Sequence, residues 1–94
     1  MAKYKIILTS SFKRQLKLIR KRNKKIEKLQ LVVDMLSDGI KLPTKYRDHS
    51  LIDNIKFYEC RECHIEPDWL LVYQLNDKEL ILLLVETGSH SDLF

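Results

Sequence analysis

The hydrophobic positions near the start of the chain first recur at every second residue and then at helical spacing. Tyr4, Ile6 and Leu8 show the first pattern, which predicts a short strand ending at Thr9. Two segments with helical spacing follow, separated at Asn23, and their apolar positions are Phe12, Leu16 and Ile19, then Ile26, Leu29, Val33 and Leu36. Ser10-Ser11 offers an N-cap to the first helix and Gly39 a C-terminal stop to the second. We expect the two helices to form a hairpin.

Strand signals return in the second half of the chain. The polar stretch over residues 42–54, which includes Pro43, predicts a loop. Four strands are expected after it, at Ile55–Glu59, Arg61–Glu66, Trp69–Leu75 and Glu79–Val85. Asn76-Asp77 is the expected hairpin turn between the last two. The run Leu80–Val85 lacks alternation, which indicates a central strand covered on both faces. The order of one strand, two helices and four strands predicts one α+β domain over residues 1–94.

Length and charge narrow the function classes. With 94 residues the chain is too short for a large cofactor-binding architecture, and its longest apolar run of six residues cannot span a bilayer. No signal peptide precedes the first strand, so a cytoplasmic location is expected. Residues 1–30 hold eleven Lys and Arg but one acid, whereas residues 31–94 hold six bases and twelve acids. Such a basic segment favours nucleic acid as partner, although an acidic protein segment, an anionic membrane or a merely solvated helix face remains open.

Cys60, Cys63 and His64 match the spacing of a haem attachment or half of a zinc site. Within a strand the two cysteines point to opposite faces, and a metal site would need further ligands beside them. Haem attachment also needs an oxidising compartment. We therefore predict two inert thiols and no metal or cofactor.

The three histidines each have a carboxylate nearby in sequence: Asp48 beside His49, Asp68 near His64, and Asp92 near His90. Imidazoles titrate near neutral pH, so a pair of them can exchange protons during phosphodiester cleavage. RNA supplies its own 2′-hydroxyl nucleophile, which removes the need for a metal. Taken singly, a histidine is more often a surface or packed residue than a catalytic one.

Three segments of the chain, taken together, resemble the YafQ branch of the RelE/ParE toxin superfamily: Tyr46–His49, Arg61–Tyr73 and Thr87–Phe94. The resemblance implies a toxin of a type II toxin-antitoxin pair that acts as a ribosome-dependent endoribonuclease on translated mRNA. It also implies a small antiparallel sheet packed against an N-terminal helical hairpin. The implied partners are a cognate antitoxin, the ribosome with its RNA, and mRNA.

Carried over position by position, the resemblance implies a catalytic set of His49, His64, Asp68, His90 and Glu62. His90 would protonate the leaving 5′-oxygen, and His49, His64 or Asp68 would take the proton of the 2′-hydroxyl. Phe94 and Trp69 would stack on a base, although Trp69 is equally explained as a core residue. The basic residues expected to face ribosomal RNA are Lys13, Lys17, Lys21, Arg22 and Lys24.

One position departs from the family pattern. Glu86 stands where members of the family generally have an arginine that stabilises negative charge on the phosphorus centre. Arg61 or Arg47 is a candidate to supply that charge, and Glu86 is itself a candidate base. The departure also leaves open a protein that keeps the fold but binds an antitoxin or nucleic acid without cutting it. The gyrase-poisoning branch of the superfamily is a third alternative, less favoured because it does not use the three histidines.

Overall fold

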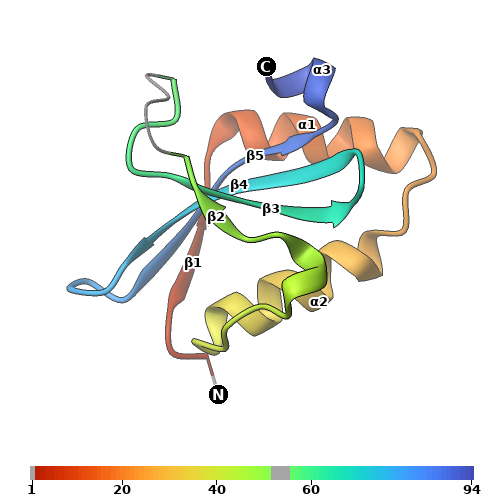
Figure 1. Cartoon of the computed structure of the whole chain (residues 1–94). Helices are drawn as coiled ribbons and strands as arrows, with labels where there is room; N and C mark the ends of the chain where they lie inside the picture. Colours follow the sequence, from red (N-terminus) through yellow and green to blue (C-terminus); the bar gives the residue numbers. More distant parts are fainter. Residues whose placement is uncertain (1, 52–55) are drawn as a thin grey trace.

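A computed structural model describes residues 2–51 and 56–94 as a five-stranded sheet with helices α1 and α2 on one face (Figure 1). The strands lie in the order β1-β5-β4-β3-β2. Along the chain the elements are β1 (Lys5–Leu8), α1 (Ser10–Lys21), α2 (Ile26–Ser37), the 3₁₀ turn η1 (Thr44–Tyr46), β2 (His49–Ser50), β3 (Arg61–Glu66), β4 (Trp69–Asn76), β5 (Ile81–Gly88) and α3 (His90–Leu93). Among the described residues, no helix has the length and apolar character needed to cross a membrane.

The α+β class is confirmed, but the sheet is mixed rather than antiparallel. Strands β2 to β5 form antiparallel pairs, whereas β1 runs parallel to β5 at the sheet edge. Parallel neighbours cannot be joined by a tight turn, and here both helices and the other three strands lie between them in sequence. Helix α1 begins earlier than expected because Thr9, whose hydroxyl accepts from the Phe12 amide at 3.0 Å, is its N-cap.

The sequence located β3 and β4 correctly but misplaced their neighbours. The strand expected at Ile55–Glu59 is wrong over residues 56–59, which form turns, and Ile55 lies outside the described residues. On the side away from β4, β3 pairs with β2, which lies inside the stretch expected to be a loop. The last strand begins at Ile81 because Leu80 adopts a left-handed turn conformation (φ 55°). In the strand order, β5 is an inner strand between β1 and β4, and the middle strand of the five is β4.

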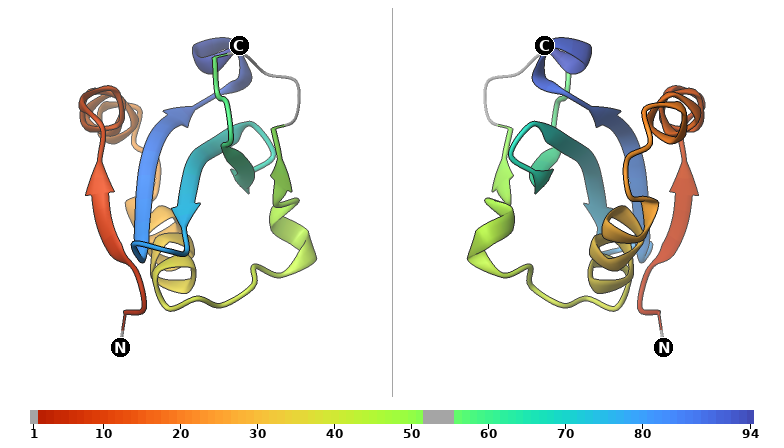
Figure 2. Two further views of the ribbon diagram at one scale, coloured as in Figure 1. Left: turned by 90° about the vertical axis from the view of Figure 1, so that its left-hand side faces the viewer. Right: turned by 90° about the vertical axis from the view of Figure 1, so that its right-hand side faces the viewer.

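Side chains of β4 alternate between two separate cores. Trp69, Leu71 and Tyr73 pack in the main core beneath α1 and α2, while Leu70 and Val72 face the opposite side of the sheet. There they pack in a smaller second core together with Phe57, Cys60 and Leu93. The strand is thus buried on both faces, and the two faces are viewed from opposite sides in Figure 2.

A bulge in β5 changes which face its end presents. Val72 pairs with Glu86, whereas Tyr73 pairs with Leu84, so Val85 is an extra residue in β5. Without it, Glu86 would lie on the same face as Leu84, in the main core. The bulge instead turns Glu86 to the face of the second core, beside Val72.

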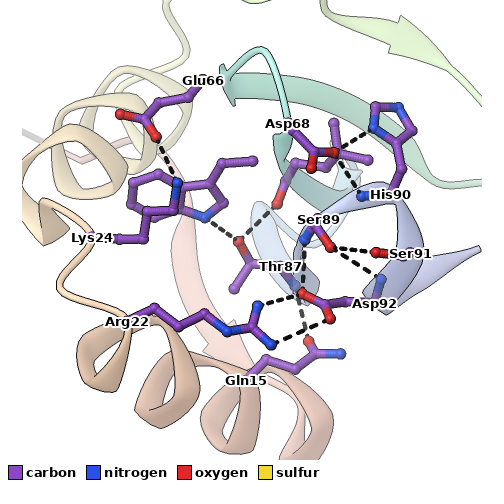
Figure 3. Close-up of polar contacts among 12 residues, drawn as sticks. Gln15, Arg22, Lys24, Glu66, Asp68, Thr87, Ser89, His90, Ser91 and Asp92 are labelled. Carbon is purple, nitrogen blue, oxygen red and sulfur yellow. Dashed lines mark hydrogen bonds and ion pairs between the residues drawn. The ribbon is translucent and has the colours of Figure 1, made fainter.

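Helix α3 has only four residues and is held in place by polar contacts (Figure 3). Ser89 and Asp92 form a capping box, in which the Ser89 hydroxyl accepts from the Asp92 amide and the Asp92 carboxylate accepts from the Ser89 amide. Arg22, from the end of α1, donates to the two Asp92 oxygens at 2.7 and 3.4 Å. This guanidinium lowers the pKa of Asp92 from 3.8 to about 2. A contact across 70 residues therefore ties the C-terminal helix to α1.

We predict that Arg22→Ala lowers the free energy of unfolding by a small amount near neutral pH, because a solvent-exposed ion pair contributes little to stability. Asp92 has a lower pKa in the folded chain than in the unfolded one, so its stabilising contribution is present above about pH 4 and is lost as the pH falls toward 2. Urea denaturation at several pH values measures this. Lys21→Ala, which changes a neighbouring exposed lysine, is the control. If Arg22→Ala is destabilised as much at pH 2 as at neutral pH, the ion pair with Asp92 is not the cause.

Candidate active site

The three histidines lie in one row on the face of the second core, although they come from three different elements. The ring centroids of His49 in β2 and His64 in β3 are 6.4 Å apart. The centroids of His64 and His90, the first residue of α3, are 5.8 Å apart. The structure therefore brings together imidazoles that are separated by 15 and 26 residues in sequence.

Glu62 lies between the first two imidazoles. It pairs with His49 across β2 and β3, and as the second residue before His64 it shares a face of β3 with that histidine. Its Oε1 lies 3.6 Å from the Nε2 atom of each ring, and the residue is only 5% exposed. A single buried carboxylate facing two ring nitrogens can accept a proton from either.

Backbone carbonyls fix the orientation of both rings. The Nδ1 atom of His49 lies 2.7 Å from the carbonyl oxygen of Arg47, and that of His64 lies 3.2 Å from the carbonyl oxygen of Pro67. Carbonyl oxygens only accept hydrogen bonds, so each Nδ1 carries a proton and donates it. Each ring is thereby held with its Nε2 atom toward Glu62.

His90 has a carboxylate partner of its own, Asp68 in the turn between β3 and β4 (Figure 3). The same Asp68 oxygen accepts from the backbone amide of His90 at 3.0 Å and lies 2.8 Å from its Nδ1. The hydrogen bond from the His90 backbone amide, and next the contact with the His90 ring, lower the pKa of Asp68. The carboxyl group therefore stays ionised near neutral pH. Nε2 of His90 is left to exchange a proton with a substrate.

Two of the aspartates that lie near the histidines in sequence have partners elsewhere in the fold. Asp68, four residues after His64, binds His90, and Asp92, two residues after His90, binds Arg22. Asp48 points to the helix-covered face, because neighbours in an extended chain face opposite sides. The i, i+2 spacing of Glu62 and His64 is the sequence signal that would have identified the correct carboxylate.

Arg61 is also on the helix-covered face, and its expected contact with substrate stays a prediction. Its guanidinium donates to both oxygens of Asp48, at 3.3 and 3.2 Å, and to Ser50 at 2.9 Å. Tyr73 donates its hydroxyl to Asp48 at 2.5 Å, and burial with this contact raises the pKa of the phenol. Together these contacts fix the segment that carries His49.

Of the two aromatic residues expected to stack on a base, only Phe94 is accessible. Trp69 is 1% exposed in the main core, where its indole Nε1 donates to Thr87 at 3.0 Å. Its expected stacking role is therefore corrected to a structural one. Phe94 is 55% exposed and packs edge-on against Phe57, with ring centroids 5.4 Å apart.

The expected RNA-facing bases divide into two groups. Lys13, Lys17 and Lys21 are exposed on α1. Arg22 is engaged by Asp92, and Lys24 lies 3.2 Å from Glu66. The described chain thus presents part of its basic N-terminal segment to solvent and uses part of it for internal ion pairs.

The cysteines are free and buried, Cys60 in the second core and Cys63 in the main core. Burial raises the pKa of both thiols, which disfavours the reactive thiolate. Within residues 2–51 and 56–94, no group of three or more His, Cys, Asp or Glu side chains is arranged to hold a metal ion.

Glu86 lies in the same row across the sheet as Glu62, with Val72 between them. Its Oε2 atom is buried and has no hydrogen-bond partner among the described residues. The nearest cation is Lys56, whose ammonium lies 3.7 Å from that oxygen and also donates to the Leu93 carbonyl at 3.2 Å. Lys56 was not identified from the sequence, and it places positive charge where Glu86 places negative charge.

Known proteins are similar to this chain in both sequence and fold. Residues 4–94 match the family model described as the bacterial toxin of type II toxin-antitoxin system, YafQ. The mRNA interferase toxin YafQ of Escherichia coli BL21-DE3 is 39% identical over 87 residues, which cover 92% of this chain and 90% of that protein.

Solved structures agree over nearly the whole chain. A chain in the crystal structure of the E. coli DinJ-YafQ toxin-antitoxin complex superposes with a TM-score of 0.88 at 33% identity, covering 98% of both chains. A metal-bound toxin from Helicobacter pylori gives a TM-score of 0.89 at 39% identity, covering 100% of both. The chain therefore belongs to the YafQ family of toxins of type II toxin-antitoxin systems.

Proposed function

We propose that this toxin cleaves translated mRNA on the ribosome by acid–base catalysis, with the RNA 2′-hydroxyl as nucleophile and without a metal ion. The relatives named mRNA interferase support RNA cleavage at the level of the family. The observation that carries the mechanism is the row of three imidazoles with two carboxylates, in which His90 has a partner separate from that of His49 and His64.

In the proposed reaction the 2′-oxygen attacks the adjacent phosphorus and the bond from phosphorus to the 5′-oxygen breaks. His90 gives its Nε2 proton to the leaving 5′-oxygen, while Asp68 stabilises the charged ring through Nδ1. The products are a 2′,3′-cyclic phosphate and a free 5′-hydroxyl. This step needs one group that releases a proton and one that receives it.

We assign the receiving role to His64 together with Glu62. Asp68 is occupied by both the amide and the ring of His90, which disfavours it as the base. His64 is adjacent to His90, and Glu62 can pass a proton between His64 and His49. The acid and the base then lie on either side of one phosphate.

Surfaces beside the cluster support the partners. Phe94 follows α3 directly and offers an exposed ring for a base. Lys13, Lys17 and Lys21 present positive charge that suits ribosomal RNA. Because a relative crystallises as the DinJ-YafQ complex, we include in the proposal a cognate antitoxin that covers the toxin.

The wild-type protein, added to ribosomes programmed with mRNA, is expected to cut within codons. His90→Ala should lower the cleavage rate by at least about 100-fold, since general acid catalysis contributes typically 10²–10⁴-fold. Mapping of the cut ends on a sequencing gel measures both. No cutting by the wild-type protein would refute the proposal.

Asp68→Asn provides a matched variant, because its action is expected to pass through His90. Alone it should slow cleavage less than His90→Ala and shift the pH profile, whereas in the His90→Ala background it should add almost nothing. Full additivity of the two substitutions would show that Asp68 acts independently of His90.

Glu86 favours a second candidate function, a non-catalytic member that binds an antitoxin or nucleic acid. A buried carboxylate in the same row as Glu62 repels the phosphate that the site must hold. This candidate predicts no cutting by the wild type and cutting by Glu86→Arg in the ribosome assay. Glu79→Arg, a charge reversal at an exposed position in the β4–β5 turn, is the control. If neither the wild type nor Glu86→Arg cuts, the second candidate is also wrong about Glu86.

A further inference from the structure

We propose that a cavity next to His64 is a nucleotide subsite, which holds the RNA residue neighbouring the cleaved bond. This inference rests on the proposed function. The cavity has a volume of about 380 Å³, within the roughly 300–1,000 Å³ typical of small-ligand pockets. It lies between α2, η1 and the end of β3, at an edge that no described strand covers beyond Glu62.

The cavity has an apolar part, which we call the floor. Leu31 of α2, Tyr46 of η1, and Ile65 and Pro67 at the end of β3 line it. Leu31 is 55% exposed, so its side chain is available for a base to pack on. A floor of this kind accepts the flat face of any base, because stacking is tolerant of sequence.

The rim is basic. Lys28, Lys45 and Arg47 line the cavity together with one acid, Glu66. Glu66 is already neutralised by two lysines, with Lys28 at 2.8 Å and Lys24 at 3.2 Å. The remaining cations, Lys45 and Arg47, therefore give the rim a positive charge that suits a phosphate group.

The position of the cavity connects it to the reaction. His64 belongs both to the cavity lining and to the imidazole row. Arg47 at the rim also holds the His49 ring through its backbone carbonyl at 2.7 Å. A nucleotide could place its nucleobase on the floor and its phosphate at the rim. It would then lie beside His64, the proposed proton acceptor. RNA is favoured over a protein segment because the basic rim and the catalytic imidazole share one boundary.

The test compares floor and rim variants with matched controls outside the cavity. Leu31→Ser and Lys45→Ala remove the floor and one rim charge, while Ile40→Ser and Lys78→Ala make the same changes at exposed positions outside it. The probe is a short, fluorescently labelled RNA with 2′-O-methyl groups, which cannot be cleaved. Affinity is measured by anisotropy at fixed salt, and circular dichroism checks that each variant folds.

We expect the cavity variants to bind this RNA about tenfold more weakly than the wild type, in the range of a lost base contact, and to raise KM for programmed mRNA with kcat largely retained. The controls should match the wild type. If the wild-type protein cuts mRNA but the cavity variants keep its affinity and KM, the subsite is wrong and the proposed function stands. If they weaken only the binding of a co-expressed antitoxin, the cavity is a protein interface instead. A wild-type protein that does not cut refutes the proposed function.

Discussion

The alternation of side chains along β3 is the constraint on which the site depends. Glu62 and His64 face the second core, and the residues between and before them, Cys63 and Arg61, face the helices. A shift of one residue in the pairing of β3 would exchange these sets and place a guanidinium and a thiol where the carboxylate and imidazole now lie. The partly buried ion pair of Arg61 with Asp48 on one face therefore helps to keep Glu62 and His64 on the other.

The second constraint concerns the short helix that carries His90. Four residues cannot form a stable helix alone, because helix nucleation is unfavourable. Its position comes instead from Leu93 in the second core, from the link between Asp92 and Arg22, and from the contact of Asp68 with His90. The position of the proposed general acid thus depends on Arg22, the C-cap of α1, a residue that the charge pattern alone assigns to RNA binding.

The sequence was sufficient for the features that follow local rules. Spacing predicted both helices, the stop at Gly39 and the boundaries of β3. The family resemblance predicted that the three histidines lie together. Left-handed turns at non-glycine residues such as Glu59 and Leu80, and the bulge at Val85, carry no comparable signal and caused the errors in strand placement.

The partners within the site were equally hidden. Which carboxylate meets which histidine is decided by strand register and by the fold of the C-terminus, not by distance along the chain. From the sequence, Trp69 was open to two interpretations. In the structure its indole nitrogen can lie inside the core because it donates a hydrogen bond to Thr87.

The central claim is that these imidazoles and carboxylates use the hydroxyl group of the RNA itself. The most direct measurement is cleavage of a programmed mRNA that carries one 2′-deoxynucleotide immediately 5′ of the cut. We expect this message to stay intact while its all-ribose counterpart is cut to a 2′,3′-cyclic phosphate end. Cutting of the deoxy-substituted message at the same bond would contradict it.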